Sequence, residues 1–479
     1  MTVDWKGQQT VIIGAARQGL ALARYLARQG ASITITDLRS ADELNDAQIA
    51  LESRVPETAH VEWVLGSHPL SVLDGADWLF VSGGVPLSNP LVVAARETGI
   101  AVTNDSQVFM EIAPCTIVGI TGSAGKTTTT SLVGQIASES ALPINVWIGG
   151  NIGTPLIDYV DQMQPEDLAV VEFSSFQLEL MTRSPQVAAV LNVTPNHLDR
   201  HESMQAYSDA KARILEFQSA GDMAILGRDD PGSWALLGKV QGRLFTFGMQ
   251  PPQEPSRWEG TCLIDDCIYL RLFSRPGDNP ELTPVLESSA VPLRGEHNLM
   301  NVLAACAIAA AAGLSVDAMR TAIKGFRGVP HRLEFVRTWG KADWYNDSIA
   351  TAPERAMAAI RSFDEPLVLL AGGRDKNLPW ASFADLVLSR VDHLIVFGEA
   401  ADKILLAVDT QALAGHQVRA RRLATITRCQ GLQEAVQAAA GLVQPGDVVL
   451  LSPGGTSFDE FKDFEERGEC FSRWVEKLP

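Results

Sequence analysis

A glycine-rich loop between a predicted strand and a predicted helix constrains the fold of this chain most. The apolar run 116–120 is typical of a buried strand, and a helical segment begins near residue 126. Between them lies Thr121-Gly122-Ser123-Ala124-Gly125-Lys126-Thr127-Thr128. Glycines let backbone N–H groups close around phosphate oxygens, and a helix N-terminus adds favourable partial charge. The loop therefore predicts a site for ATP or GTP within an α/β domain.

Two side chains of this loop have the chemistry that a nucleotide site needs. We expect Lys126 to neutralise phosphate charge and the Thr127 hydroxyl to bind Mg²⁺. The spacing departs from the full Walker A pattern, because Ile120 stands where that pattern has its first glycine. The alternative is an ordinary Gly/Thr turn, which the position between strand and helix disfavours.

Strands and helices alternate in three blocks along the 479 residues, a length that suits about three domains. In the first block, the strand 10–14 ends in glycine and is followed by a helical stretch and a second strand that ends at Asp37. This is the layout of a Rossmann-like half. We therefore predict an α/β protein with a Rossmann-like N-terminal domain, a P-loop ATPase-like central domain and a Rossmann-like C-terminal domain. Their predicted limits are 1–106, 107–328 and 329–479.

Composition argues against several classes of protein. Lys and Arg total 39 against 57 Asp and Glu, and the net charge of -18 disfavours a nucleic-acid binder with a broad basic surface. The N-terminus has no signal layout, and the longest apolar run, 302–314, is too short to span a bilayer. Six cysteines in 479 residues make no disulfide framework. We expect a cytoplasmic monomer with small-molecule partners, and neither nucleic acid nor membrane insertion.

Polar residues follow two further predicted strands of the central block. Glu172 ends the strand 168–172, where it would serve as an oxygen ligand for Mg²⁺ or, alternatively, cap a helix. The segment 192–201 also follows a strand and is dense in ligand-type side chains. Lys211 lies in the helical segment that comes next, and composition alone makes it a surface lysine.

Several motifs recur along the chain in an order and spacing that match one known family. They are the loop 121–128, Glu172-Phe173-Ser174-Ser175-Phe176-Gln177-Leu178-Glu179, Asn192-Val193-Thr194, His197-Leu198-Asp199-Arg200, Gly295-Glu296-His297-Asn298, His331-Arg332, Asn346-Asp347-Ser348 and Asp375-Lys376. Together they resemble the Mur ligase family over nearly the whole chain. The C-terminal stretch 451–468 is most similar to the branch that joins D-glutamate to UDP-N-acetylmuramoyl-L-alanine in peptidoglycan precursor synthesis. The resemblance implies an ATP-dependent amide-forming ligase that acts through an acyl phosphate.

The resemblance gives roles to residues of the central block. Lys211 matches the lysine that is carbamoylated in this family, which replaces the surface-lysine interpretation. The resemblance implies two Mg²⁺ ions, with Thr127, Glu172, His197 and Lys211 as their ligands. It also implies that the catalytic residues are Lys126, His197 and Lys211. The implied ATP contacts are Gly122, Ser123, Ala124, Gly125, Lys126, Thr127, Thr128, Asn298, Arg332 and Asp347.

The first block has two other interpretations besides the one that the family implies. The glycine pattern from Gly14 to Gly19, with Asp37, is typical of a dinucleotide site, but Ala16 replaces the middle glycine. The pattern would also suit a turn that binds no ligand. The resemblance implies instead that this block holds the UDP end of the substrate, through Arg17, Gln18, Asp37, Arg39, Ser82 and Gly84, with Asn151 of the central block.

By the same resemblance, the third block binds the added amino acid. The matching positions are Thr351, Lys376, Ser457 and Phe464. Ile349 stands where many of these ligases have lysine, so L-glutamate remains the alternative to D-glutamate. A regulatory ATPase and a nicotinamide dehydrogenase are the competing functions. The first leaves the 457–464 motif unused, and the second leaves the phosphate loop unexplained.

Overall fold

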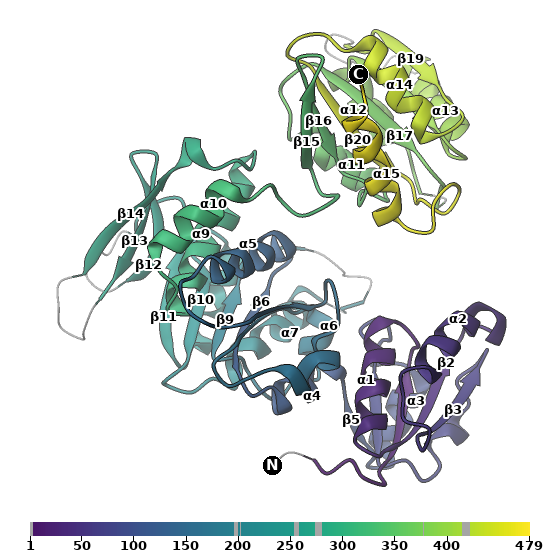
Figure 1. Ribbon diagram of the computed structural model, residues 1–479, viewed down its shortest axis with the longest axis vertical. Helices are drawn as coiled ribbons and strands as arrows, with labels where there is room; N and C mark the ends of the chain where they lie inside the picture. The colour runs from purple at the N-terminus through teal and green to yellow at the C-terminus, as the bar shows by residue number, and fades with distance from the viewer. Residues whose placement is uncertain are drawn as a thin grey trace. The chain divides into compact units, whose positions relative to one another are not determined.

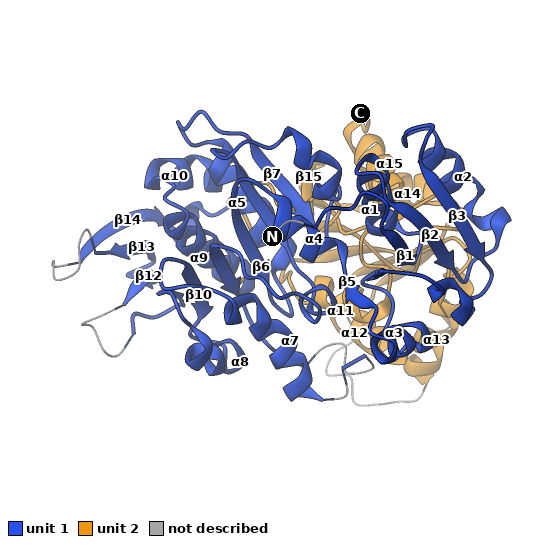
Figure 2. Cartoon of the chain, turned by 90° about the horizontal axis from the view of Figure 1, so that it is seen from below, with its two compact units in different colours: residues 1–292, 296–326 blue, residues 293–295, 327–479 orange. Residues whose placement is uncertain are grey.

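The computed structural model describes residues 3–195, 200–201, 203–252, 258–273, 280–376, 378–413 and 422–479. His197, a predicted catalytic residue and metal ligand, lies outside these ranges. The chain divides into two units, residues 1–292 with 296–326 and residues 293–295 with 327–479 (Figure 2). The first unit contains two β-sheets and the second contains one. The predicted three-domain α/β fold is confirmed by these sheets, while the exact domain limits remain predictions.

The first sheet has the Rossmann-like arrangement that the sequence predicts. Its strand order is β3-β2-β1-β4-β5, and every pair is parallel. Figure 1 shows β2, β3 and β5 of this sheet in purple, together with the helices α1, α2 and α3. The order reverses at β1, and the crevice beyond the strand ends at such a point is where ligands bind. The elements are β1 (Gln9–Ile13), α1 (Arg17–Arg28), β2 (Ser32–Asp37), α2 (Ala41–Glu52), β3 (His60–Leu65), η1 (Leu70–Leu73), β4 (Trp78–Val81), α3 (Pro90–Glu97), β5 (Ala101–Thr103) and α4 (Asp105–Ile112).

The second sheet carries the phosphate loop at the end of a central strand. Its order is β14-β13-β12-β11-β10-β9-β6-β8-β7, parallel from β7 to β12 and antiparallel beyond. Strand β6 therefore has neighbours on both sides, and its residues 117–121 are buried, as its apolar sequence predicts. The strands are β6 (Thr116–Thr121), β7 (Val146–Gly150), β8 (Leu168–Glu172), β9 (Val187–Val190), β10 (Met223–Gly227), β11 (Arg243–Phe247), β12 (Glu259–Ile264), β13 (Cys267–Leu272) and β14 (Glu281–Glu287).

Helices connect the parallel strands of the second sheet, and α9 and α10 follow its last strand. The Ala-rich part of α9 is buried at residues 301–309, and α9 packs against α5. Small alanine side chains allow the two helices to approach closely. The helices are α5 (Lys126–Ser138), η2 (Leu156–Gln162), α6 (Ser175–Leu178), α7 (Met204–Glu216), α8 (Pro231–Trp234), η3 (Ala235–Lys239), η4 (Ser288–Ala290), α9 (Glu296–Ala311) and α10 (Val316–Gly325).

The second unit is a doubly wound sheet of order β15-β16-β20-β17-β18-β19, in which only the β15–β16 pair is antiparallel. Val368 and Leu369, adjacent in β17, enter separate apolar clusters on opposite faces, because strand side chains alternate. The elements are β15 (Glu334–Trp339), β16 (Ala342–Asn346), α11 (Pro353–Ile360), β17 (Leu367–Gly372), α12 (Ala381–Arg390), β18 (His393–Phe397), α13 (Ala401–Leu413), β19 (Thr425–Arg428), α14 (Leu432–Leu442), β20 (Val448–Gly454) and α15 (Phe464–Glu476).

Within the described ranges, no helix combines the length and the apolar character needed to cross a membrane. The apolar run 302–311 lies inside α9, which is 16 residues long. This is shorter than the roughly 20 residues that a membrane-spanning helix needs.

Candidate active site

The phosphate loop connects β6 to α5, and a side chain from the neighbouring strand holds it in shape. Gly125 has a φ of 80° and is the residue just before α5. Asn192, which follows β9, accepts a hydrogen bond from the Ala124 backbone N–H at 2.8 Å and donates one to the Ala124 carbonyl at 3.1 Å. Sequence reasoning placed Asn192 in a motif without giving it a role. Its position after a buried strand was the available signal.

Replacing Gly125 with alanine is expected to damage the loop. A Cβ atom at this position would lie 2.2 Å from Asn301 Oδ1, and the left-handed φ disfavours any L side chain. We expect the G125A variant to lose at least about tenfold in kcat/KM for ATP. Steady-state kinetics with varied ATP would measure this. Gly238→Ala is a control, since an added Cβ there meets nothing within 4 Å.

Two lysines converge on one carbonyl of the loop. Lys126 Nζ and Lys211 Nζ each donate a hydrogen bond to the Gly122 carbonyl at 2.9 Å. Lys211 is only 1% exposed, so the surface interpretation drawn from composition is wrong. Burial, followed by the nearby charge of Lys126, lowers the pKa of Lys211 to about 7, while Glu172 acts in the opposite direction. Near pH 7 a substantial fraction of Lys211 is therefore a neutral amine.

Glu172 ends β8 as a buried carboxylate with two side-chain partners. Its Oε2 accepts a hydrogen bond from Thr127 Oγ1 and its Oε1 accepts one from Asn151 Nδ2, both at 2.9 Å. Ser174, not Glu172, caps the next helix, α6. The structure thus brings together two predicted metal ligands, Thr127 and Glu172. Hydroxyl and carboxylate oxygens are ligands that Mg²⁺ prefers.

His201 is a buried residue that sequence reasoning did not single out. Its ring stacks on Phe176 at 5.2 Å between centroids and an interplanar angle of 7°. Its Nε2 lies 2.9 Å from Ser175 Oγ, and its Nδ1 lies 3.2 Å from Glu179 Oε1. These contacts anchor the chain before α7, the helix of Lys211, to α6. The sequence signal was its place in the polar segment that follows β9.

The predicted UDP contacts Asp37 and Ser82 meet at the carboxyl ends of the first sheet's strands. Asp37 accepts hydrogen bonds from the Ala15 N–H at 2.8 Å and from Arg39 Nη2 at 2.8 Å. The hydrogen bond from Arg39 is the main reason that the pKa of Asp37 lies well below its usual range. Ser82 Oγ donates to the Gly14 carbonyl at 3.2 Å. This is the crevice where a doubly wound sheet binds ligands.

Two other predicted UDP contacts, Arg17 and Gln18, reach the central sheet's loop. Arg17 Nη1 donates to the Gly153 carbonyl at 3.2 Å, and Gln18 Nε2 donates to the Gly150 carbonyl. Asn151 lies between these two glycines and bonds to Glu172 as described above. Within the first unit, Arg17 and Gln18 are therefore linked to the loop 150–153, whose Asn151 bonds to the predicted metal ligand Glu172.

Two further contacts join the same two sheets. Arg24 Nε donates to Asp158 Oδ1 at 2.8 Å, and both side chains are largely shielded from solvent. Arg200 Nη1 donates to the carbonyl of Gly84, a predicted UDP contact, at 2.9 Å. The N-terminal and central sheets are thus joined by several polar contacts.

Asn298 and Arg332, two predicted ATP contacts, lie in different units. Asn298 Oδ1 accepts a hydrogen bond from Asn301 Nδ2 at 3.1 Å, and Asn301 packs under the phosphate loop. Arg332 begins the second unit's sheet region, between His331 and Leu333, which both have positive φ values of 63° and 44°. A positive φ is uncommon for residues other than glycine, so the surrounding structure must hold His331 and Leu333 in this conformation.

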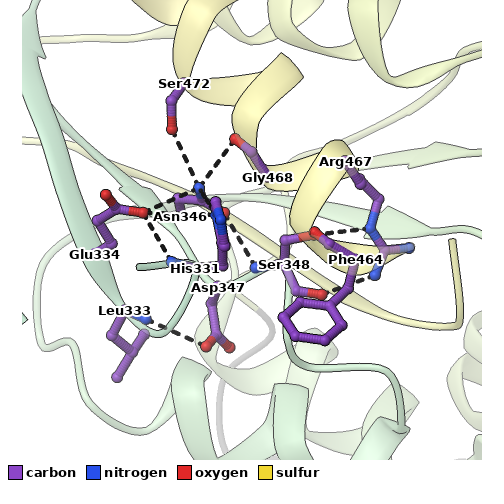
Figure 3. Close-up of polar contacts among 10 residues, drawn as sticks. All are labelled: His331, Leu333, Glu334, Asn346, Asp347, Ser348, Phe464, Arg467, Gly468 and Ser472. Atoms are coloured by element: carbon purple, nitrogen blue, oxygen red, sulfur yellow. Dashed lines mark hydrogen bonds and ion pairs between the residues drawn. The ribbon is translucent and has the colours of Figure 1, made fainter. Parts of the chain in front are cut away.

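Asp347, the remaining predicted ATP contact, directly follows β16. It accepts hydrogen bonds from Ser452 Oγ at 2.8 Å and from the Leu333 N–H at 3.2 Å, the latter seen in Figure 3. Burial raises the pKa of this carboxyl to about 7, and the bond from Ser452 only partly opposes that.

The raised pKa of Asp347 predicts a pH dependence of stability. From its ordinary value of 3.8 up to about 7, the unfolded chain ionises this carboxyl while the folded chain keeps the proton. The stability that Asp347 contributes is therefore fully present below its ordinary pKa of 3.8. It is lost as pH rises through the folded-state pKa of about 7. We expect the D347N variant, compared with wild type, to gain relative stability between pH 5 and pH 8. Urea unfolding at both values would measure this, and an unchanged difference would contradict it.

The predicted glutamate contacts lie around the carboxyl ends of β16, β17 and β20. Ser457 is buried after β20, and Phe464 begins α15. Thr351 precedes α11, and its N–H donates to the Ile349 carbonyl at 2.8 Å. Lys376 follows β17 and is exposed. Because these strands are neighbours in one sheet, their ends bring the four positions to the same edge.

Comparisons with known protein families cover most of the chain. The model described as the Mur ligase MurD-like N-terminal domain matches residues 8–104. The Mur ligase middle domain matches residues 120–309, and the Mur ligase glutamate ligase domain matches residues 331–455. Each match contains one of the three sheets or most of it.

Full-length relatives agree with these matches. The chain is 38% identical over 473 residues to the UDP-N-acetylmuramoylalanine–D-glutamate ligase of Symbiobacterium thermophilum, covering 98% of each chain. It is 38% identical over 483 residues to the ligase of the same name from Pelotomaculum thermopropionicum, covering 100% of this chain and 99% of the relative.

Solved structures of more distant proteins share the fold. MurC (UDP-N-acetylmuramate–alanine ligase) from Thermotoga maritima matches with a TM-score of 0.55 at 16% identity, covering 98% of this chain and 99% of the other. MurF from Acinetobacter baumannii matches with a TM-score of 0.53 at 18% identity, covering 98% and 93%. Taken with the family matches and the full-length relatives, this similarity shows that the chain belongs to the Mur ligase family.

Proposed function

We propose that this protein uses ATP to join D-glutamate to UDP-N-acetylmuramoyl-L-alanine. The observation that carries the proposal is the convergence of Lys126 and Lys211 on the Gly122 carbonyl, beside the Thr127–Glu172 pair. A loop that only binds nucleotide has no need of a second, buried lysine. The names of the full-length relatives indicate the substrates.

The proposed reaction has two steps. The alanine carboxylate of the UDP precursor attacks the γ-phosphorus of ATP, so a carboxylate O–P bond forms and the bond to ADP breaks. The glutamate amine then attacks the acyl carbon, loses a proton, and expels phosphate through a tetrahedral intermediate. Lys126 and the loop's backbone N–H groups hold the charge that develops on the transferred phosphoryl group. Catalysis here is chiefly positioning and electrostatic stabilisation.

The residues present fit a magnesium ion. Thr127 and Glu172 place a hydroxyl and a carboxylate oxygen at one end of the phosphate loop, and Asn151 fixes the carboxylate's other oxygen. Mg²⁺ is commonly bound by one or two protein oxygens together with substrate phosphates and water. When bound, Mg²⁺ would neutralise negative charge on the phosphates. His197, the other proposed ligand, lies outside the described residues.

Lys211 fits carbamoylation. Carbamoylation needs the neutral amine, which adds to CO₂ and loses a proton, so that the neutral side chain becomes an anion. Burial keeps the pKa of Lys211 near 7 and supplies that neutral form. The carbamate would offer oxygen ligands close to Glu172 and the phosphate loop. This modification also removes the repulsion between two adjacent lysine charges.

We favour D-glutamate over L-glutamate, because the full-length relatives are named as D-glutamate ligases. Mass spectrometry of the product, with each enantiomer supplied separately, tests the choice. We expect the glutamyl product with D-glutamate and little or none with L-glutamate. Equal product from both enantiomers, or product from L-glutamate alone, would contradict the proposed stereochemistry while leaving the ligation itself intact.

A further inference from the structure

The second unit contains a completely buried guanidinium on the first turn of α15. Arg467 is 0% exposed. Its Nε donates to Ser348 Oγ at 2.9 Å, and its Nη2 donates to the Ser348 carbonyl at 2.8 Å (Figure 3). Its Nη1 donates to the Gly455 carbonyl at 3.1 Å. Within the described part of the chain, each of these hydrogen bonds ends on an uncharged oxygen.

The two acids whose charges act on Arg467 are hydrogen-bonded to other groups. Asp459 and Glu460 raise its pKa through their charge, but burial has the larger effect and lowers the pKa to about 10. Asp459 Oδ2 accepts from the Glu399 N–H at 3.2 Å, and Glu460 Oε2 accepts from the Leu432 N–H at 3.1 Å. Arg467 is therefore a cation at neutral pH. Burying a charge that has no bonded counter-ion costs free energy, even where its donors are hydrogen-bonded.

The contacts of Arg467 join the three segments that carry the proposed glutamate site. Ser348 lies in the turn after β16, and its Oγ donates in turn to the carbonyl of Phe464 at 2.8 Å. Gly455 begins the loop that leads from β20 to Ser457. Gly373, in the loop from β17 to Lys376, packs so closely that a Cβ there would lie 2.8 Å from Arg467 Nη1.

We propose that Arg467 is a positioning residue for glutamate binding, whose guanidinium holds Ser348, Gly455 and Phe464 together and whose charge favours a carboxylate beside them. This proposal rests on the proposed function, which supplies glutamate as the ligand. A planar guanidinium is suited to the role, because its donors are fixed relative to one another. Glutamate carries two carboxylates, so a nearby cation lowers the cost of bringing them to this edge of the sheet.

Helix α15 has other anchors, so Arg467 is not needed merely to hold it. Asn346 Nδ2 lies 3.1 Å from the Gly468 carbonyl and 3.1 Å from Ser472 Oγ, both on α15 (Figure 3). Phe471 and Val475, on the same helix, are fully buried in the apolar cluster that also contains Trp344. A variant at position 467 keeps these other anchors of the helix.

Kinetics of the R467M and R467K variants test the proposal. Both side chains are unbranched and of similar length, but methionine lacks the charge and lysine lacks the planar fork. For R467M we expect KM for glutamate to rise about ten- to hundredfold, the effect of losing hydrogen bonds to a charged group. KM for ATP and for the UDP precursor should change by less than about threefold. R467K should show a smaller rise in the same constant.

The R428M variant is the control. Arg428 pairs with Asp402 on the surface of the same unit, so R428M makes the same substitution away from the site and should match wild type. If R467M fails to fold, R467K decides. A wild-type KM for glutamate in R467K would overturn the positioning role. An equal rise in KM for glutamate, ATP and the UDP precursor would also overturn it. An inactive wild-type enzyme would instead refute the proposed function, so the two failures are distinguishable.

Discussion

Replacing Lys211 with alanine is expected to reduce ligation to below about one-thousandth of the wild-type rate, because Lys211 acts as a unit with Lys126 and Glu172. The substitution removes the amine that bonds to the Gly122 carbonyl, and with it the proposed carbamate. Steady-state product formation would measure the loss. Short carboxylic acids, which mimic the carbamate, should restore part of the activity of K211A.

A control separates this effect from the general loss of a lysine. Lys239 is half exposed and pairs with Glu216, so K239A should retain wild-type activity. In addition, wild-type protein equilibrated with ¹³C-bicarbonate should show a carbamate ¹³C resonance that K211A lacks. Unchanged activity in K211A would refute the catalytic role. Full loss of activity without a carbamate resonance in wild type would refute the modification alone.

The K126A variant is expected to lose about a hundred- to a thousandfold in kcat, the usual effect of removing one preorganised group that stabilises developing charge. Lys126 begins α5, and its Nζ reaches back over the loop to the Gly122 carbonyl. Because Lys126 acts on the transferring phosphoryl group, kcat should fall by more than KM for ATP rises. Rapid-quench measurement of the phosphorylation step at several ATP concentrations would separate the effect on kcat from the effect on KM.

A second substitution at the same position sharpens the test. K126R keeps the charge but changes the geometry, so it should retain more activity than K126A and less than wild type. If K126A changed only KM for ATP and left kcat intact, Lys126 would contribute uniform binding and not transition-state stabilisation.

Much of the fold could be predicted because local patterns determine it. The apolar runs that became β6, β8 and β9 are buried on both faces, which is why they read as continuous apolar stretches. The glycine loop lies between strand and helix as its sequence indicated, with Gly125 in the left-handed conformation that favours glycine. The order of strands across each sheet needed the structure, because non-local pairing leaves no local pattern.

The candidate site could be predicted only where a motif carried it. Burial of Lys211 depends on α7 packing beside the phosphate loop, and composition gave the opposite expectation. Arg467 lies in the stretch 451–468 that resembles the family. Its hydrogen bonds reach Gly455 nearby and Ser348, which is more than a hundred positions away in the sequence. Such a role follows from tertiary packing and cannot be deduced from spacing.

The measurement that tests the central claim most directly is phosphate release by the purified protein, with ATP and Mg²⁺ present throughout. Four reactions are compared: no substrate, UDP-N-acetylmuramoyl-L-alanine alone, D-glutamate alone, and both together. The ligase mechanism predicts rapid phosphate release only when both substrates are present, with one ligated product formed for each phosphate. Phosphate release at the same rate in all four reactions would show an ATPase that ligates nothing, and would contradict the proposed function.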